Sequence, residues 1–155
     1  MRLKFVQSVW KDMVARGGVE KALLPHMQIS QANANFVRAE LTVDNAHLNR
    51  LGSMHGGVVS TLVDVGGSLA LASRGMFMTG VTTDMSSTFM SHVGKPGDRL
   101  RIDCHLDKMG RTMAFTFVQV YRLAGDKYQL VARGSHTKYI SSALKSDRNV
   151  TFEDS

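Results

Sequence analysis

Asp64 is an isolated acidic residue within an apolar stretch, and this position points to chemistry. It is the only charged residue between His55 and Arg74. An ionised carboxylate in an apolar setting costs several kcal/mol unless it is paired or hydrogen-bonded. One interpretation is a core aspartate that has a partner or faces a cavity. The other is a general base or acid, because desolvation raises the pKa of a carboxyl group into a useful range.

A pair of glycines opens the same apolar segment. Gly56 and Gly57 leave backbone N–H groups that no side chain shields, and a helix N-terminus carries partial positive charge. This combination suits a carbonyl oxygen that acquires negative charge, so the Gly56 N–H is a candidate oxyanion donor. The alternative is that the glycines only permit a tight turn.

The spacing of these two groups predicts a site shared between subunits. Gly56 and Asp64 are eight residues apart, which is about 12 Å along a helix. A base that acts through one water must lie within about 6 Å of the carbonyl carbon, two hydrogen-bond lengths. If they cooperate, Asp64 must therefore come from a neighbouring subunit, with the helices side by side and antiparallel, as in a two-fold dimer.

The elements that position these groups follow from hydrophobic periodicity. Apolar residues alternate over 37–43, which predicts a strand, and residues 56–74 are apolar nearly all round, which predicts a helix buried on every side. Four further period-two segments follow at 81–89, 100–107, 113–123 and 128–140. We therefore expect an α+β domain in which a curved, largely antiparallel sheet wraps around a long central helix.

The chain also resembles a known family. The run Asn49-x-x-Gly52-x-x-His55-Gly56-Gly57-x-x-x-x-Leu62-x-Asp64 is similar to the signature of hotdog-fold thioesterases of the phenylacetic-acid-degradation and 4-hydroxybenzoyl-CoA group. Further matches lie at Gly80–Met85, Gly110–Phe115 and Gly134–Lys138, and the resemblance covers Phe36 to Tyr139. It implies a hotdog fold, hydrolysis of acyl-CoA to free acid and CoA, and assembly as a homodimer at minimum, usually a homotetramer.

The resemblance implies a role for each catalytic position. Asp64 matches the carboxylate that activates water or attacks directly, and Gly56 the residue whose N–H polarises the thioester carbonyl. His55 matches a residue that orients this segment beside the thioester sulfur, and Asn49 an amide that holds the carbonyl or the water. Thr82 stands where relatives have a serine that positions the water, so the hydroxyl is kept and a methyl is added.

The resemblance also implies where the CoA phosphates bind. Gly110, Arg111 and Thr112 match a hairpin that meets these phosphates in the family, and the guanidinium of Arg111 is able to form forked hydrogen bonds to phosphate. His136 and Lys138, expected on the surface, are the weaker candidates for the same role.

Other functions remain open at this stage. A hotdog dehydratase of 3-hydroxyacyl thioesters also pairs a histidine with a carboxylate, and an acyl-CoA-binding module needs no catalysis. For a thioesterase, the resemblance suggests medium- to long-chain fatty acyl-CoA as the first candidate substrate and arylacetyl or hydroxybenzoyl thioesters as the second. The choice between Asp64 as general base and as covalent nucleophile is open. No cofactor or metal is expected, because the six histidines are dispersed. Cys104 lies on the apolar face of its strand and is expected to be inert.

Composition limits the partners and the compartment. The formal charge is +6 with a sequence pI of about 9.8, but the cations are scattered, which favours a phosphate-rich ligand over nucleic acid. No membrane span is expected, since the longest apolar stretch is short and Asp64 interrupts it. The single cysteine permits no intramolecular disulfide and fits a reducing compartment.

The two ends frame one expected domain, residues 1–155. A basic amphipathic helix is predicted at about residues 3–17; it either packs on the domain or is a mitochondrial presequence. The protein is therefore expected in the cytoplasm or the mitochondrion. Residues 143–155 form a polar tail that is expected to fray.

Overall fold

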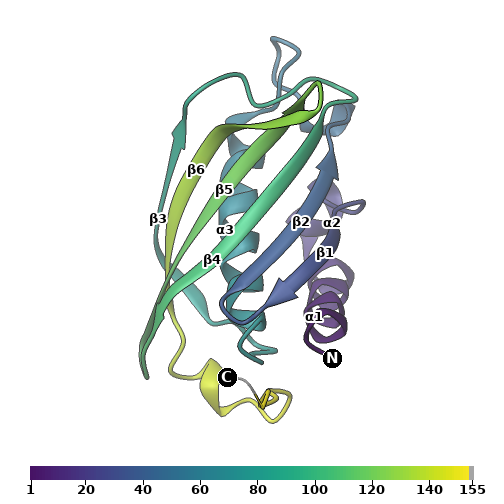
Figure 1. Cartoon of the computed structure of the whole chain (residues 1–155). Coiled ribbons are helices and arrows are strands. Elements are labelled where there is room, and N and C mark those ends of the chain that lie inside the picture. The colour runs from purple at the N-terminus through teal and green to yellow at the C-terminus, as the bar shows by residue number, and fades with distance from the viewer. Residues whose placement is uncertain (154–155) are drawn as a thin grey trace.

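A computed structural model, which describes residues 1–153, has one antiparallel sheet wrapped around one long helix (Figure 1). The helices are α1 (Arg2–Arg16), α2 (Gly18–Leu23) and α3 (Gly56–Ala72), and the strands are β1 (Gln28–Asn33), β2 (Phe36–Thr42), β3 (Val81–Phe89), β4 (Arg99–Met109), β5 (Met113–Ala124) and β6 (Lys127–Tyr139). Two 3₁₀ turns, Asn45–His47 and Ala143–Lys145, complete the described elements.

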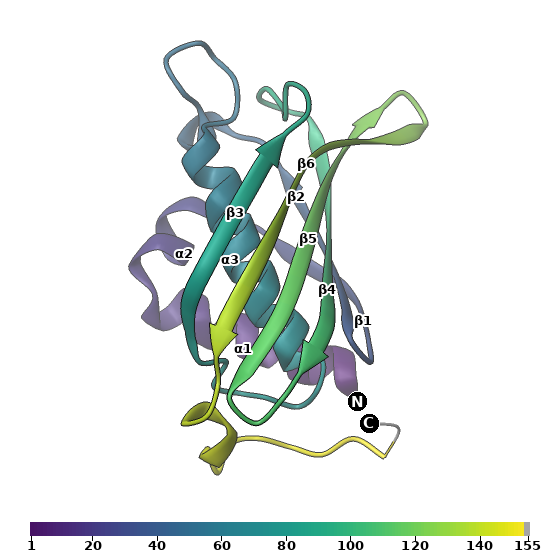
Figure 2. The same ribbon diagram turned by 90° about the vertical axis from the view of Figure 1, so that its left-hand side faces the viewer.

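The sheet order is β1-β2-β4-β5-β6-β3, and every neighbouring pair is antiparallel. Its concave side holds α3, as Figure 2 shows from the β3 side. The apolar residues of α3 and the inward positions of the strands form one continuous core. The predicted curved sheet around a central helix is therefore confirmed.

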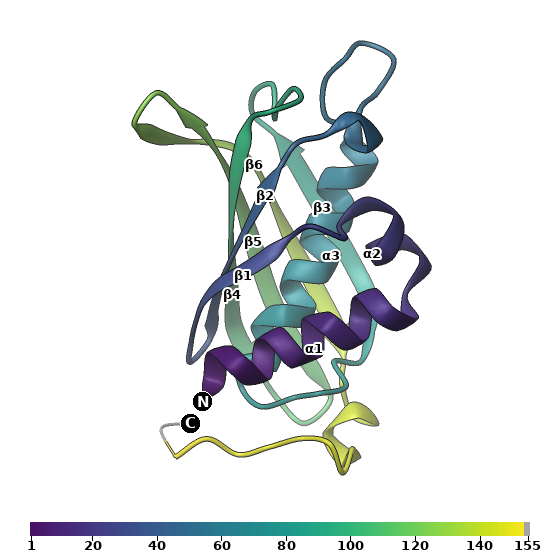
Figure 3. The ribbon, with the colours of Figure 1, turned by 90° about the vertical axis from the view of Figure 1, so that its right-hand side faces the viewer.

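The N-terminal helix lies beside this assembly (Figure 3). α1 spans Arg2–Arg16, close to the predicted residues 3–17, and buries Val6, Val9 and Trp10. The Trp10 indole N–H donates to the Met27 carbonyl oxygen at 3.0 Å, which anchors α1 next to the start of β1. Among the described residues, no helix combines the length and apolarity needed to cross a membrane.

One strand was not predicted. β1 has the sequence QISQAN, in which only Ile29 is buried, so it lacks the alternation of a half-buried strand. It forms an edge of the sheet, pairing with β2 alone, and an edge strand needs fewer apolar side chains. The prediction of a single strand before the long helix is therefore wrong.

The tail is also better packed than predicted. Phe152 is buried, and its ring meets Phe5 edge to face with the centroids 5.7 Å apart. The Val150 N–H donates to the Gly75 carbonyl oxygen at 2.8 Å. The described part of the tail therefore folds back over the domain rather than fraying; its last two residues, 154–155, lie outside the described structure.

One stripe of α3 remains open, so the prediction of burial on every side is wrong there. Gly57, Ser60, Thr61 and Asp64 are partly or fully exposed, whereas every residue from Val65 to Ala72 is buried. Their spacing of three or four residues places them on one face of the helix. The sheet ends at β3, and within residues 1–153 no further strand covers this face.

Candidate active site

Asp64 stands at the open stripe of α3 and faces the start of β3. Its side chain is 50% exposed, and its Oδ1 accepts a hydrogen bond from the Thr82 hydroxyl at 3.1 Å. Thr82 Oγ1 in turn lies 2.8 Å from His136 Nε2, and this ring nitrogen is 3.4 Å from Asp64 Oδ1. Three titratable or hydroxyl groups from α3, β3 and β6 thus form one cluster, the carboxylate cluster.

His136 and Lys138 lie inside the protein, which corrects the prediction that they are surface residues. Both are buried, because β6 points alternate residues inward and the inward set includes Gly134, His136 and Lys138. Lys138 Nζ donates to Ser68 Oγ at 2.5 Å. The sequence of β6 indicates this burial, because His136 and Lys138 alternate with Gly134 on the same face of the strand, and that face is the one packed against α3.

Burial changes the acid–base properties of both side chains. Burial and the positive charge of Lys138 lower the pKa of His136 to about 4, against the attraction of Asp64. Burial lowers the pKa of Lys138 to about 8, again opposed by Asp64. At neutral pH the imidazole of His136 in the cluster is therefore neutral, and the Lys138 ammonium beside the cluster is largely protonated. Burial also raises the pKa of the Cys104 thiol, which agrees with its predicted inertness.

The cluster requires a close approach of α3 to the sheet at Gly67. A Cβ atom added there would lie 2.2 Å from His136 Nδ1 and 2.5 Å from Thr116 Oγ1. Only glycine leaves room for the imidazole at this position.

We predict that Gly67→Ala destabilises the fold by about 1–3 kcal/mol, because the added methyl overpacks a buried site. Urea unfolding monitored by circular dichroism measures the change. Helix propensity alone acts in the opposite direction, since alanine is the better helix former. An unchanged or raised free energy of unfolding would therefore contradict the close packing described above.

The start of α3 leaves one backbone donor free. His55 is the N-cap residue, and its Nδ1 accepts from the Gly57 N–H at 2.8 Å. The Val58 N–H donates to the His55 carbonyl oxygen at 2.9 Å. Among the hydrogen bonds of residues 1–153, none uses the Gly56 N–H. The predicted oxyanion donor is thus the one that local capping leaves unpaired.

The Asn49 side chain forms hydrogen bonds within its own loop. Its Oδ1 accepts from the Leu51 N–H at 2.9 Å and the Ser53 N–H at 3.2 Å, and its Nδ2 donates to Ser53 Oγ at 3.1 Å. These bonds shape the loop that precedes α3. Contact between this amide and the carboxylate cluster is absent from the described structure.

Within one chain the two parts of the site lie apart. Gly56 faces Phe89, whose ring would be 3.4 Å from an added Cβ, at the end of β3. Asp64 faces Thr82, near the start of the same strand. The structure therefore brings Asp64, Thr82 and His136 together, but not Asp64 and Gly56.

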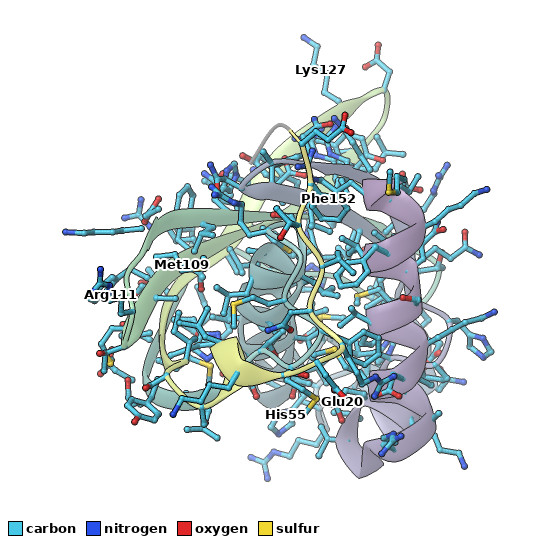
Figure 4. All side chains as sticks on the ribbon, turned by 90° about the horizontal axis from the view of Figure 1, so that it is seen from below. Glu20, His55, Met109, Arg111, Lys127 and Phe152 are labelled. Carbon is cyan, nitrogen blue, oxygen red and sulfur yellow. The ribbon has the colours of Figure 1, made fainter. Side chains whose placement is uncertain are left out.

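The predicted phosphate-binding hairpin joins β4 to β5. Gly110, Arg111 and Thr112 are exposed, and the Gly110 N–H donates to the Met113 carbonyl oxygen at 2.9 Å. Arg111 lies at the rim of the molecule in Figure 4, and among residues 1–153 the hydrogen bonds and the ion pair of the carboxylate cluster do not include it.

Comparison with known proteins gives consistent matches. The sequence profile described as "Thioesterase superfamily" matches residues 51–129. Acyl-coenzyme A thioesterase 13 of Mus musculus is 34% identical over 137 residues, which are 88% of this chain and 95% of that protein. The crystal structure of zebrafish thioesterase superfamily member 2 has a TM-score of 0.79 and 33% identity, covering 88% of this chain and 96% of the other. A hypothetical thioesterase protein from Streptococcus pneumoniae, solved with coenzyme A, has a TM-score of 0.67 and 28% identity over 75% of this chain and 89% of its own.

Proposed function

The chain belongs to the thioesterase superfamily and is a thioester hydrolase, and on this premise we propose that it hydrolyses medium- to long-chain fatty acyl-CoA to the free acid and CoA. The observation that carries the proposal is the Asp64 carboxylate, half exposed on an otherwise buried helix and hydrogen-bonded to Thr82. A carboxylate in this position is able to take a proton from water beside a bound thioester.

The exposed strand β3 supports a site shared by two protomers. β3 is an edge of the sheet, and Val81, Met85 and Phe89 are exposed along it. An open apolar edge is a template for pairing with another chain. Two copies that pair antiparallel along β3 place the start of one strand beside the end of the other. Asp64 of one protomer then approaches the Gly56 N–H of its partner, as the spacing along α3 requires.

Hydrolysis in this arrangement follows from the roles of the groups. Asp64 accepts a proton as the water oxygen bonds to the thioester carbon, and the carbonyl oxygen gains negative charge opposite the Gly56 N–H. The C–S bond then breaks, and the proton passes from Asp64 to the departing CoA sulfur. Thr82 holds Oδ1 of the carboxylate in place, while His55 and Asn49 shape the segment that presents Gly56.

An apolar groove supports the proposal that the substrate carries a fatty acyl group. A cavity of about 370 Å³ lies between α1, the α3–β3 connection and the tail, and its apolar lining includes Val9, Met13, Phe77, Met78 and Val81. Val81 directly precedes Thr82, and we therefore place the start of the acyl groove next to the carboxylate cluster. An apolar lining of this kind suits an alkyl chain more than a polar acyl group.

The opposite end of the substrate carries phosphates. The net charge of +6 attracts them, and Arg111 on its exposed hairpin is our candidate for a direct contact, with the Gly110 and Thr112 backbone beside it. His136 and Lys138 are buried, so we assign them no contact with phosphate.

A panel of acyl-CoA substrates, read by release of free CoA thiol, tests the proposal. We expect turnover that rises from short chains to medium and long chains and stays lower for hydroxybenzoyl-CoA. Hydration of crotonyl-CoA without thiol release would instead identify a dehydratase. Tight binding of every substrate without thiol release would identify a binding module.

Gly56→Pro tests the oxyanion donor. Gly56 is the first residue of α3, where proline is favoured, and His55 already has the extended conformation that precedes proline, with φ −65° and ψ 137°. The variant should therefore fold. We expect kcat/KM to fall by about 100- to 1000-fold, because one preorganised donor is lost.

Gly56→Ala is the matched control for this variant, since it adds a Cβ but keeps the N–H. We expect it to retain activity to within about tenfold, a much smaller loss than that of a missing donor. Steady-state kinetics of the two variants decide the matter. Equal losses would show that the side chain, and not the N–H, is responsible.

A further inference from the structure

Lys138 is a buried lysine with only neutral hydrogen-bond partners. The residue is 3% exposed, and Nζ donates to Ser68 Oγ at 2.5 Å and Thr79 Oγ1 at 3.4 Å. Over residues 1–153, it takes part in none of the ion pairs. An ammonium group in this position is costly to bury. Packing alone therefore does not explain why a lysine occupies it.

Lys138 stands directly behind the carboxylate cluster. It follows His136 by two residues on the inward face of β6 and is the register partner of Thr82 on β3. Ser68, which receives its hydrogen bond, lies one turn after Asp64 on α3. The ammonium therefore adjoins all three elements that build the cluster.

We propose that Lys138 is a positioning residue for thioester hydrolysis: its buried positive charge, together with burial of the ring, holds His136 neutral to lower pH, so that the Asp64 carboxylate remains available to take a proton from water in mildly acidic solution. The proposal rests on the function proposed above for Asp64. Lys138 touches neither substrate nor water in this role and acts through His136.

The contacts of His136 favour a neutral imidazole, because Nδ1 is buried without a hydrogen-bond partner among the described residues and a proton on it would have no acceptor. Thr82 has a single hydroxyl proton, which it donates to Asp64 Oδ1, so its oxygen must accept from His136 Nε2–H. A second proton would convert His136 to an imidazolium 3.4 Å from Asp64 Oδ1. That ion pair would compensate the carboxylate and weaken it as a base.

The charges around the imidazole are few, and their signs are clear. Asp64 on α3 favours the protonated form of His136, and Lys138 on β6 opposes it. Thr82 from β3 places a neutral hydroxyl at the ring, and Thr116 from β5 donates to the His136 backbone carbonyl oxygen. The backbone of α3 at Val63 favours the protonated ring. Burial and Lys138 together lower the pKa of His136 to about 4. Removal of Lys138 must therefore raise the pKa of His136, and the inactive protonated form will appear at higher pH.

The first test compares Lys138→Met with Lys127→Met, which makes the same chemical change at the exposed first residue of β6, next to the β5–β6 turn (Figure 4). We measure the pH dependence of kcat/KM for hydrolysis of an acyl-CoA that the wild type turns over. For Lys138→Met the acid limb should move to higher pH by about one unit. For Lys127→Met it should not move. A methionine of similar volume should be tolerated in the core.

The second test reads His136 directly. An NMR titration of its ring, assigned with His136→Gln, should give a pKa of about 4 in the wild type and a higher value in Lys138→Met. Lys138→Gln keeps a donor for Ser68 but removes the charge, so the same shift is expected there even if the methionine variant fails to fold.

The proposal is overturned if the acid limb and the His136 titration of the charge-removing variants match the wild type. The proposed function would still stand in that case, provided that the wild type releases thiol and Asp64→Asn does not. A wild type that releases no thiol from any acyl-CoA would instead overturn the proposed function, and the NMR titration would still test the coupling between Lys138 and His136.

Discussion

Asp64→Asn should reduce kcat/KM for acyl-CoA hydrolysis by roughly 1000-fold, the scale of a lost general base. The amide has nearly the shape of the carboxylate and is able to accept the Thr82 hydrogen bond, but it cannot accept a proton from water. Because the side chain is half exposed, the substitution leaves no buried charge without a partner. We therefore expect a folded protein with an unchanged unfolding midpoint and almost no turnover.

Asp126→Asn is the matched control, since it makes the same change at the exposed turn between β5 and β6. Its kinetics should equal those of the wild type. Thiol release under saturating substrate, with circular dichroism to verify folding, measures both variants. If Asp64→Asn keeps near-normal turnover of any good substrate, the carboxylate is not the base.

Hydrolysis in ¹⁸O-water under single-turnover conditions separates the two possible uses of Asp64. With a general base the labelled oxygen enters the fatty acid, whereas with a covalent nucleophile it enters the Asp64 side chain when water cleaves the mixed anhydride at the Asp64 carboxyl carbon. The hydrogen bond from Thr82 to Oδ1 leaves Oδ2 for water, and we expect the label in the fatty acid.

Residues that are unusual for their surroundings were predictable from the sequence. Asp64 was recognised because a lone carboxylate in an apolar helix is costly, and Gly56 because two glycines at a helix start expose N–H groups. Both arguments depend on local composition and helix geometry, which a sequence contains. The long helix and five of the six described strands were predictable for the same reason, since strong periodicity survives without tertiary information.

The features that were not predicted are β1, the open stripe of α3 and the burial of Lys138, and each depends on tertiary position. β1 lacks alternation because it is an edge strand, and edges are defined by what they pair with. The open stripe of α3 consists of small residues, Gly57, Ser60 and Thr61, which do not stand out as a polar face. Lys138 was expected at the surface because lysine usually lies there, and only the inward parity of β6 places it in the core.

Two chains that carry one defect each should restore activity when they are combined. In a heterodimer of an Asp64→Asn chain and a Gly56→Pro chain, one site receives an intact Asp64 from the second chain and an intact Gly56 from the first. The other site receives both defects. We expect the purified heterodimer, isolated through two different affinity tags, to have about half the activity of the wild-type dimer, whereas each parent is nearly inactive.

The reciprocal heterodimer gives the opposite result and excludes a site within one chain. When both substitutions are placed in the same chain and paired with a wild-type chain, each shared site has one defect, so the dimer should be nearly inactive. A site built from Gly56 and Asp64 of the same chain predicts the reverse: half activity here and none in the first heterodimer. Thiol release from the two heterodimers therefore distinguishes a site shared between chains from a site within one chain, because the two models predict activity in opposite preparations. The eight-residue separation of Gly56 and Asp64 along α3 permits only the shared site to hydrolyse a thioester.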